Sequence, residues 1–163
     1  MSKIQQAIRI TGIMLAATVM AVSSAAAGVH EKMTDGSARA GIQATLDRTS
    51  AVLRINGSAQ QFADAFYAPD LMITGEGEKT YRDLKSFMPF LAAFLPSVIK
   101  GDCHIRIVGP VRHSGNLASA FTQDYCKPVA PGKPAASYRM LLVFSHGPKG
   151  WRVVQELFVS GSF

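Results

Sequence analysis

The spacing of apolar residues changes once along this chain, and that change restricts the possible folds more than any other feature. From residue 38 to residue 95, apolar residues recur at steps of three and four, the period of an amphipathic helix. From residue 103 to residue 159, apolar and polar residues alternate between turns that contain Gly or Pro, as in β-strands. The sequence therefore predicts one α+β domain over residues 38–163, with helices packed on one face of a curved antiparallel sheet.

Local signals divide this domain into elements. Asn56-Gly57 ends the first predicted helix, because glycine readily adopts the left-handed cap conformation. Ser58 begins the second helix, with Gln61 at the spacing of a capping box. The predicted helices span 38–55, 58–67 and 81–95, and the predicted strands span 71–74, 103–108, 117–126, 137–144 and 151–159.

Residues 1–27 have the three parts of a secretory signal peptide. Lys3 and Arg9 lie in a segment without acids, an uncharged apolar run covers 10–22, and small residues follow as far as Ala27. The apolar run is shorter than the roughly 20 residues that a membrane span needs. We expect cleavage, a periplasmic or secreted mature protein and no stable membrane anchor. The alternative is an uncleaved anchor or a buried amphipathic helix.

Charge and composition bear on partners and cofactors. The chain has a net charge of +6, but its positive residues are spread out, unlike the basic clusters of nucleic-acid-binding proteins. The four histidines have no spacing typical of metal ligands, and no glycine-rich phosphate loop occurs. We therefore expect no nucleic-acid partner, no metal site and no cofactor. Residues 28–37 are polar and contain glycine, which predicts a flexible lead-in.

The two cysteines favour a disulfide, because exported chains form them readily. A two-residue turn at Ser114-Gly115 places Cys103 directly opposite Cys126. A β-bulge at Gly109-Pro110 would instead shift the register by one residue and place His104 opposite Asp124. We predict the Cys103–Cys126 disulfide, with the bulged register as the alternative.

Alternation along the strands assigns side chains to the two faces of the sheet. The face predicted to lie under the helices carries Tyr138, Met140, Leu142 and Phe144; Trp151, Val153, Gln155 and Leu157; and Leu117, Ser119, Phe121, Gln123 and Tyr125. The opposite face carries the ionisable residues Asp124, Arg139, Arg152, Glu156, His104 and Arg106.

A face of alternating charges is usually solvated or pairs across a dimer interface. The alternative is that the sheet curls enough to bring Asp124, Arg139 or Glu156 into a cavity. A carboxyl group desolvated there has a raised pKa and can act as a general base. A tyrosine could then donate a hydrogen bond to a developing oxyanion; the candidates are Tyr67, Tyr125 and Tyr138.

Two stretches carry a resemblance to a known family. Residues 58–70 form a helix that runs into Y-x-P-D before a strand, and Gly150-Trp-Arg-Val opens the last strand of a hairpin that begins at Ser137. Together they resemble the nuclear transport factor 2-like superfamily, which includes ketosteroid isomerase and SnoaL-like cyclases. The resemblance implies a cone-shaped sheet with three N-terminal helices on its concave face. Many relatives carry a His shortly after this Trp, whereas Gln155, Glu156 and Leu157 occupy that region here.

The resemblance implies three functions. The first is an exported domain that binds a small apolar or amphipathic ligand in its cone and forms a homodimer through the outer face of the sheet. The alternative is a cofactor-independent isomerase, cyclase or dehydratase of the SnoaL or ketosteroid-isomerase type, and the third is an assembly domain without a ligand. The candidate catalytic residues are Asp124, Tyr138 and Glu156, and the candidate ligand-binding residues are Phe66, Tyr67, Tyr125, Trp151 and Gln155.

Overall fold

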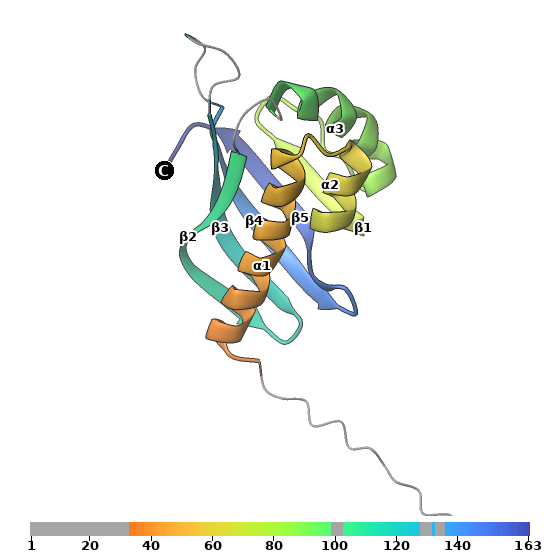
Figure 1. Cartoon of the computed structure of the whole chain (residues 1–163). Helices are drawn as coiled ribbons and strands as arrows, with labels where there is room; N and C mark the ends of the chain where they lie inside the picture. The colour runs from red at the N-terminus through yellow and green to blue at the C-terminus, as the bar shows by residue number, and fades with distance from the viewer. Residues whose placement is uncertain (1–32, 99–102, 128–131, 133–135) are drawn as a thin grey trace, which may run out of the picture. The chain divides into compact units, whose positions relative to one another are not determined.

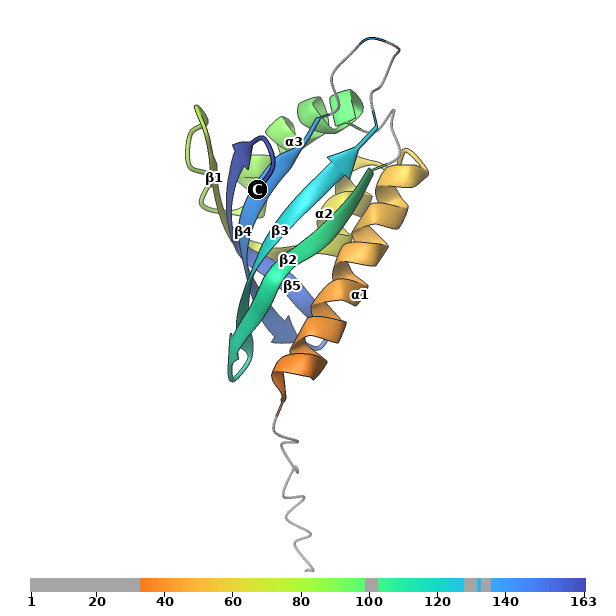
Figure 2. The ribbon, with the colours of Figure 1, turned by 90° about the vertical axis from the view of Figure 1, so that its left-hand side faces the viewer.

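The computed structural model describes residues 33–98, 103–127, 132 and 136–163. The described residues form three helices and five strands, and the helices lie on one side of the sheet (Figures 1 and 2). The predicted α+β class is confirmed. The predicted signal peptide, residues 1–27, lies outside the described residues. Within the described part of the chain, no helix is long and apolar enough to cross a membrane.

The first helix, α1, spans Asp35–Arg54 and begins earlier than its apolar pattern predicted. The Thr34 side chain accepts a hydrogen bond from Ser37 N at 3.1 Å, and Thr34 N donates to Ser37 Oγ at 2.9 Å. This reciprocal pair satisfies backbone groups at the start of the helix. The predicted flexible lead-in is therefore wrong for residues 35–37, which are helical.

The second helix, α2 (Ala59–Phe66), has the predicted capping box. Gln61 N donates to Ser58 Oγ at 3.2 Å, and Ser58 N donates to Gln61 Oε1 at 2.8 Å. The strand β1 (Tyr67–Gly75) follows at once, because Tyr67 takes an extended conformation.

The third helix, α3 (Leu84–Val98), begins three residues later than predicted. Tyr81 pairs with Ile73 as an isolated bridge instead of starting the helix. Asp83 then caps the helix by accepting a hydrogen bond from Ser86 N at 2.6 Å.

The sheet has the order β1-β5-β4-β3-β2. Its remaining strands are β2 (Cys103–Ser114), β3 (Leu117–Cys126), β4 (Tyr138–Gly147) and β5 (Gly150–Ser160). The strands from β2 to β5 form an antiparallel meander, but β1 joins β5 in parallel. The sheet is therefore mixed, whereas alternation had predicted an antiparallel one, because period-2 patterning does not show strand direction.

The β2–β3 hairpin contains both features that the sequence offered as alternatives. Ser114 pairs with Leu117, so the turn lies one residue later than predicted. A register shift then occurs between Val108 and Arg112, where Gly109 has a φ of 80° that favours glycine. The later turn and the bulge compensate for each other.

Cys103 consequently pairs with Cys126, and the two form the predicted disulfide. His104 pairs with Tyr125 rather than with Asp124. The disulfide joins the start of β2 to the end of β3.

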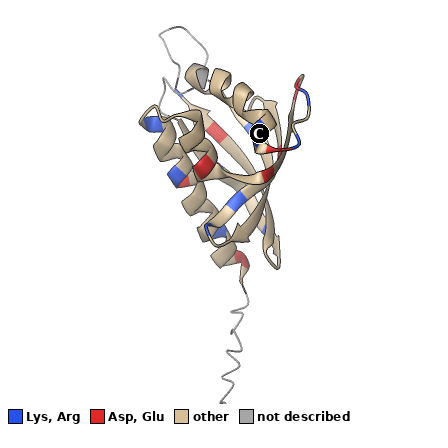
Figure 3. Ribbon diagram, turned by 90° about the vertical axis from the view of Figure 1, so that its right-hand side faces the viewer, with Lys and Arg blue, Asp and Glu red and all other residues tan. Residues whose placement is uncertain are grey.

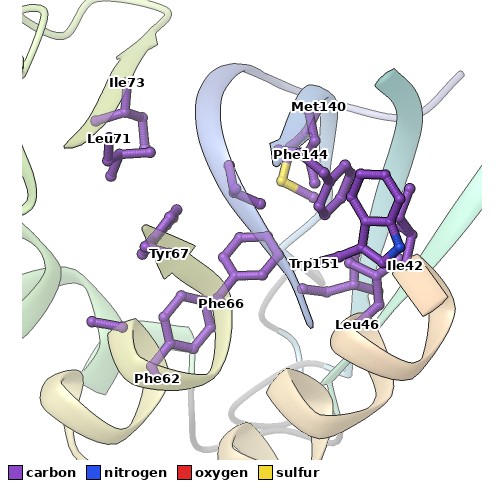
Figure 4. Packing of buried hydrophobic residues seen from close by; sticks show 14 of the residues in the cluster. Ile42, Leu46, Phe62, Phe66, Tyr67, Leu71, Ile73, Met140, Phe144 and Trp151 are labelled. Carbon is purple, nitrogen blue, oxygen red and sulfur yellow. The ribbon is translucent and has the colours of Figure 1, made fainter. Parts of the chain in front are cut away.

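Trp151 packs in the core beneath α1, next to Ile42 and Leu46 (Figure 4). Its backbone oxygen accepts a hydrogen bond from Thr45 Oγ1 at 3.0 Å. A Cβ atom at Gly41 would lie 2.6 Å from Trp151 Cδ1. The absence of a side chain at Gly41 therefore allows α1 to lie directly on the indole ring.

Candidate functional site

A cavity of about 70 Å³ lies between α2, α3 and the inner face of the sheet. Its walls are mainly aromatic and aliphatic, but they include two carboxyl groups. The lining residues are Leu53, Phe62, Phe66, Tyr67, Ile73, Phe87, Phe90, Leu91, Phe94, Leu95, Ile105, Asp124, Cys126, Tyr138, Met140, Glu156 and Phe158.

A β-bulge in β5 brings Glu156 into this cavity. Phe144 pairs with Val153 and Val143 pairs with Gln155, so Val154 is an extra residue between them. An extra residue reverses the faces that simple alternation assigns to the residues after it. Glu156 is buried as a result, and the prediction that Gln155 lies under the helices is wrong.

The faces predicted for β3 are also reversed. Its inner side chains are small or polar and include Ala118, Ala120 and Asp124. Phe121 and Tyr125 are 49% and 43% exposed on the outer face. Alternation alone could not choose between these faces, because β3 carries apolar residues on both of them.

Glu156 makes a buried hydrogen bond with a tyrosine that lies where α2 runs into β1. The Tyr67 hydroxyl donates to Glu156 Oε2 at 2.9 Å, and the exposed fractions of the two residues are 6% and 8%. Burial raises the pKa of Glu156 to about 7; the Tyr67 hydrogen bond opposes this shift and the nearby Asp124 adds to it. Burial and Glu156 raise the pKa of Tyr67 well above its usual value. At neutral pH, Glu156 is therefore poised between its acid and its base form.

Asp124 is the second carboxyl group of the cavity and comes from the C-terminal end of β3. It accepts a hydrogen bond from Tyr138 N. Burial raises the pKa of Asp124 to about 6, although hydrogen bonds from backbone N–H groups oppose the shift. Burial and the neighbouring Asp124 raise the pKa of Tyr138. Two carboxyl groups whose pKa values are raised by burial therefore line the same cavity.

The structure brings together five of the eight candidate site residues predicted from the sequence. The five that line the cavity are Phe66, Tyr67, Asp124, Tyr138 and Glu156. The remaining three lie elsewhere. Tyr125 stacks with His104 on the outer face, Trp151 packs under α1, and Gln155 points away from the helices.

Sequence reasoning missed the aromatic wall that α3 contributes. Phe87, Phe90 and Phe94 all line the cavity. Their spacing of three and four residues was a usable signal, but none of them was among the candidate site residues.

No Lys, Arg or His occurs among the described residues that line the cavity. Lys and Arg are separated along the ribbon in Figure 3, with Asp and Glu among them. Within the described ranges, no group of three or more His, Cys, Asp and Glu residues could hold a metal ion. The polar chemistry of the cavity wall is therefore that of carboxyl and phenol groups.

Comparison with protein-family models and with curated proteins finds no match. Several solved structures are similar in fold. An NTF2-like protein with a cystatin-like fold from Novosphingobium aromaticivorans has a TM-score of 0.60 at 17% identity, covering 76% of this chain and 83% of that chain. An NTF2-like protein from Pseudomonas putida has a TM-score of 0.62 at 15% identity, covering 80% and 92%.

A ketosteroid isomerase-like protein from Erwinia carotovora has a TM-score of 0.54 at 19% identity, covering 77% of this chain and 97% of that chain. These identities are too low to transfer an activity, since one fold supports many functions. The agreement in architecture is nevertheless consistent across these structures. The chain therefore has an α+β, cone-like fold similar to that of these NTF2-like and ketosteroid isomerase-like proteins.

Proposed function

We propose that this domain binds a small, largely apolar molecule in the cavity between its helices and its sheet. The observation that carries the proposal is the pair of carboxyl groups, Asp124 and Glu156, set in an otherwise apolar wall. Burying a carboxyl group is unfavourable unless it is compensated. Polar groups of this kind in an apolar pocket typically orient a ligand.

A second candidate function is acid–base catalysis. Glu156 lies 2.9 Å from the Tyr67 hydroxyl, and Asp124 lines the same cavity. Asp124, with the lower pKa, would accept a proton from the substrate. Protonated Glu156 would donate a hydrogen bond to the developing oxyanion, while the Tyr67 hydroxyl donates to Glu156 Oε2 and holds the carboxyl group in place.

The proposed setting is the periplasm or the extracellular space. Residues 1–27 supply the signal-peptide pattern, and a Cys103–Cys126 disulfide is typical of oxidising compartments. We also propose a homodimer formed through the outer face of the sheet. Its support is the row of large apolar side chains that this face exposes, among them Met72, Leu117, Phe121, Tyr125 and Leu157.

Native mass spectrometry of the mature protein, purified gently from the periplasm, tests the binding function. We expect a small molecule to remain bound to the wild type and to be reduced in the Glu156→Gln and Asp124→Asn variants. Glu78→Gln is the matched control, because Glu78 is exposed outside the cavity. Wild type that carries no small molecule and gains none from a periplasmic extract would refute the proposal.

Solvent deuterium exchange tests the catalytic candidate. We expect wild type to accelerate exchange at the α-carbon of a small ketone such as cyclohexanone, and Asp124→Asn to lose this acceleration. Equal rates for wild type, variant and buffer would exclude general-base catalysis on this probe. The binding function would be unaffected by that result.

A further inference from the structure

We infer that the cavity selects a small organic cation, an amine or quaternary ammonium group with an apolar body. This inference deepens the proposed binding function and rests on it. It is based on the composition of the cavity wall: two carboxyl groups and a set of aromatic rings surround one cavity, and no basic side chain occurs among the described lining residues.

The first argument is the sign of the charge in the cavity. Glu156 comes from β5 and is buried, and Asp124 comes from β3 and is partly buried; both line a mainly apolar wall. An anion would be repelled by both carboxylates. A neutral ligand would leave their mutual repulsion in place. A cation between them would compensate both charges in a medium where Coulomb interactions are strong.

The second argument is the arrangement of the aromatic rings. Phe87 stacks on Phe90 at 5.5 Å, Phe90 stacks on Phe94 at 5.7 Å, and Phe94 meets Tyr138 edge-on at 5.7 Å. These rings run from α3 toward the strand beside Asp124. Aromatic faces carry negative electrostatic potential and attract cations, most strongly away from water. The wall therefore favours a cationic head group over an isosteric neutral group.

The third argument is the unfilled hydrogen-bonding capacity of Glu156. Its Oε2 atom accepts the Tyr67 hydrogen bond, whereas no described donor bonds to Oε1. The residue is only 8% exposed. A carboxylate at such a depth is stabilised by pairing with a donor or a cation. An ammonium ligand would supply that partner.

The volume of the cavity limits the size of the ligand. About 70 Å³ corresponds to about two water molecules at roughly 30 Å³ each. A trimethylammonium group is larger than this, so a ligand of that size must displace side chains of the wall or extend out of the cavity.

Ligand binding should also release protons. Glu156 is faced by Tyr67 from the junction of α2 and β1 and by Asp124 from β3, and Asp124 is in turn faced by Tyr138 from β4. A bound cation favours the carboxylate form of both acids. Affinity for the cation should therefore rise between pH 5 and pH 8, by at most about tenfold per pH unit for each proton released. A neutral ligand should not show this rise.

Three isosteric probes test the inference: choline, its neutral analogue 3,3-dimethylbutan-1-ol, and the anion 3,3-dimethylbutanoate. Affinities are measured by NMR titration of the mature protein at pH 5 and pH 8. We expect choline to bind about tenfold or more tighter than the alcohol at pH 8, with the anion weakest. Calorimetry in buffers of different ionisation enthalpy should detect the released proton.

Variants test whether the two carboxyl groups cause the preference for choline and its rise with pH. Glu156→Gln and Asp124→Asn should each weaken choline binding more than binding of the alcohol, so that the preference for choline shrinks and its pH dependence flattens. Glu78→Gln should change neither. Circular dichroism establishes that each variant is folded, and the two carboxyl variants provide independent tests if one of them fails to fold.

Equal affinity for the alcohol and choline would overturn the cation assignment and leave the ligand-binding function standing. Preference for the anion, or choline binding that neither carboxyl variant alters, would do the same. If none of the probes binds, the cation assignment falls. Native mass spectrometry then decides separately whether the cavity binds another class of molecule.

Discussion

At the scale of single residues, Glu156 is the one acidic side chain that is buried among the described residues. It lies 8% exposed beside Tyr67 and Asp124, and its pKa is raised to about 7. The position does not favour folding at neutral pH, because the folded protein must hold a carboxyl group that the unfolded chain ionises freely. Such unfavourable burial is common where a group acts on a ligand.

This burial predicts a pH-dependent gain in stability for Glu156→Gln. Since the folded pKa of about 7 exceeds the unfolded value of 4.5, the contribution of Glu156 to stability is fully present below pH 4.5 and is lost as pH rises through 7. The amide keeps an acceptor for Tyr67 and does not ionise. Urea unfolding should show the variant more stable than wild type by about 2–3 kcal/mol at pH 8, with the difference shrinking toward pH 5. An equal difference at both pH values would contradict the buried, ionising Glu156.

At the scale of elements, the position of α1 depends on the close approach of its backbone at Gly41 to the indole ring of Trp151. The helix contains two glycines, Gly36 and Gly41, but only Gly41 lies on the ring of Trp151. The cavity lies further along the sheet, under α2 and α3. Gly41 can therefore be mutated without changing a residue that lines the cavity, to which α1 contributes only Leu53 near its C-terminal end among the described residues.

The two glycines of α1 form a matched pair of mutations. Gly41→Ala places a methyl group 2.6 Å from Trp151 Cδ1, and we expect it to destabilise the fold by about 1–3 kcal/mol. At Gly36 the nearest atom lies at an ordinary contact distance, so Gly36→Ala should be neutral or stabilise by up to about 1 kcal/mol. Thermal unfolding of both variants measures the difference. Equal effects would mean that the indole does not pack against Gly41.

At the scale of the whole molecule, the disulfide and the outer face are the features with global effects. The Cys103–Cys126 bond closes a loop with a sequence separation of 23. A cross-link of this span stabilises by about 3 kcal/mol, mainly by restricting the unfolded chain. Replacing both cysteines by alanine should lower the free energy of unfolding by that amount. Reductant should destabilise wild type and leave the double variant unchanged; a response of the double variant would point to another origin.

The proposed homodimer makes a prediction about the outer face. Leu157 is 49% exposed there, and Leu157→Lys adds a charge to the apolar row. Analytical ultracentrifugation should show wild type as a dimer and the variant as a folded monomer. Lys85→Glu, at an exposed position on α3, is the control and should stay dimeric. A wild type that sediments as a monomer at every concentration would refute the interface.

Short-range patterns were sufficient for much of the architecture. The order of the elements and the Ser58–Gln61 capping box follow from spacings of a few residues. The Cys103–Cys126 pair was predicted correctly from a turn placed one residue too early, because the bulge in β2 compensates for the later turn. The start of α1 was missed, because its cap at Thr34 precedes the apolar pattern. The helical start predicted at Tyr81 was wrong, because that residue pairs with Ile73 instead.

The sequence by itself determined the α+β class and the residue types available for the site. Only the tertiary structure decided which faces of β3 and β5 lie inward. In β5 a single extra residue, Val154, moves Glu156 inside and Gln155 outside, and in β3 both faces are apolar enough to be buried. The alternation of apolar and polar residues does not show which of them point inward after a bulge, and it does not show which face of the sheet the helices cover. The cavity carboxyls are therefore a product of long-range packing.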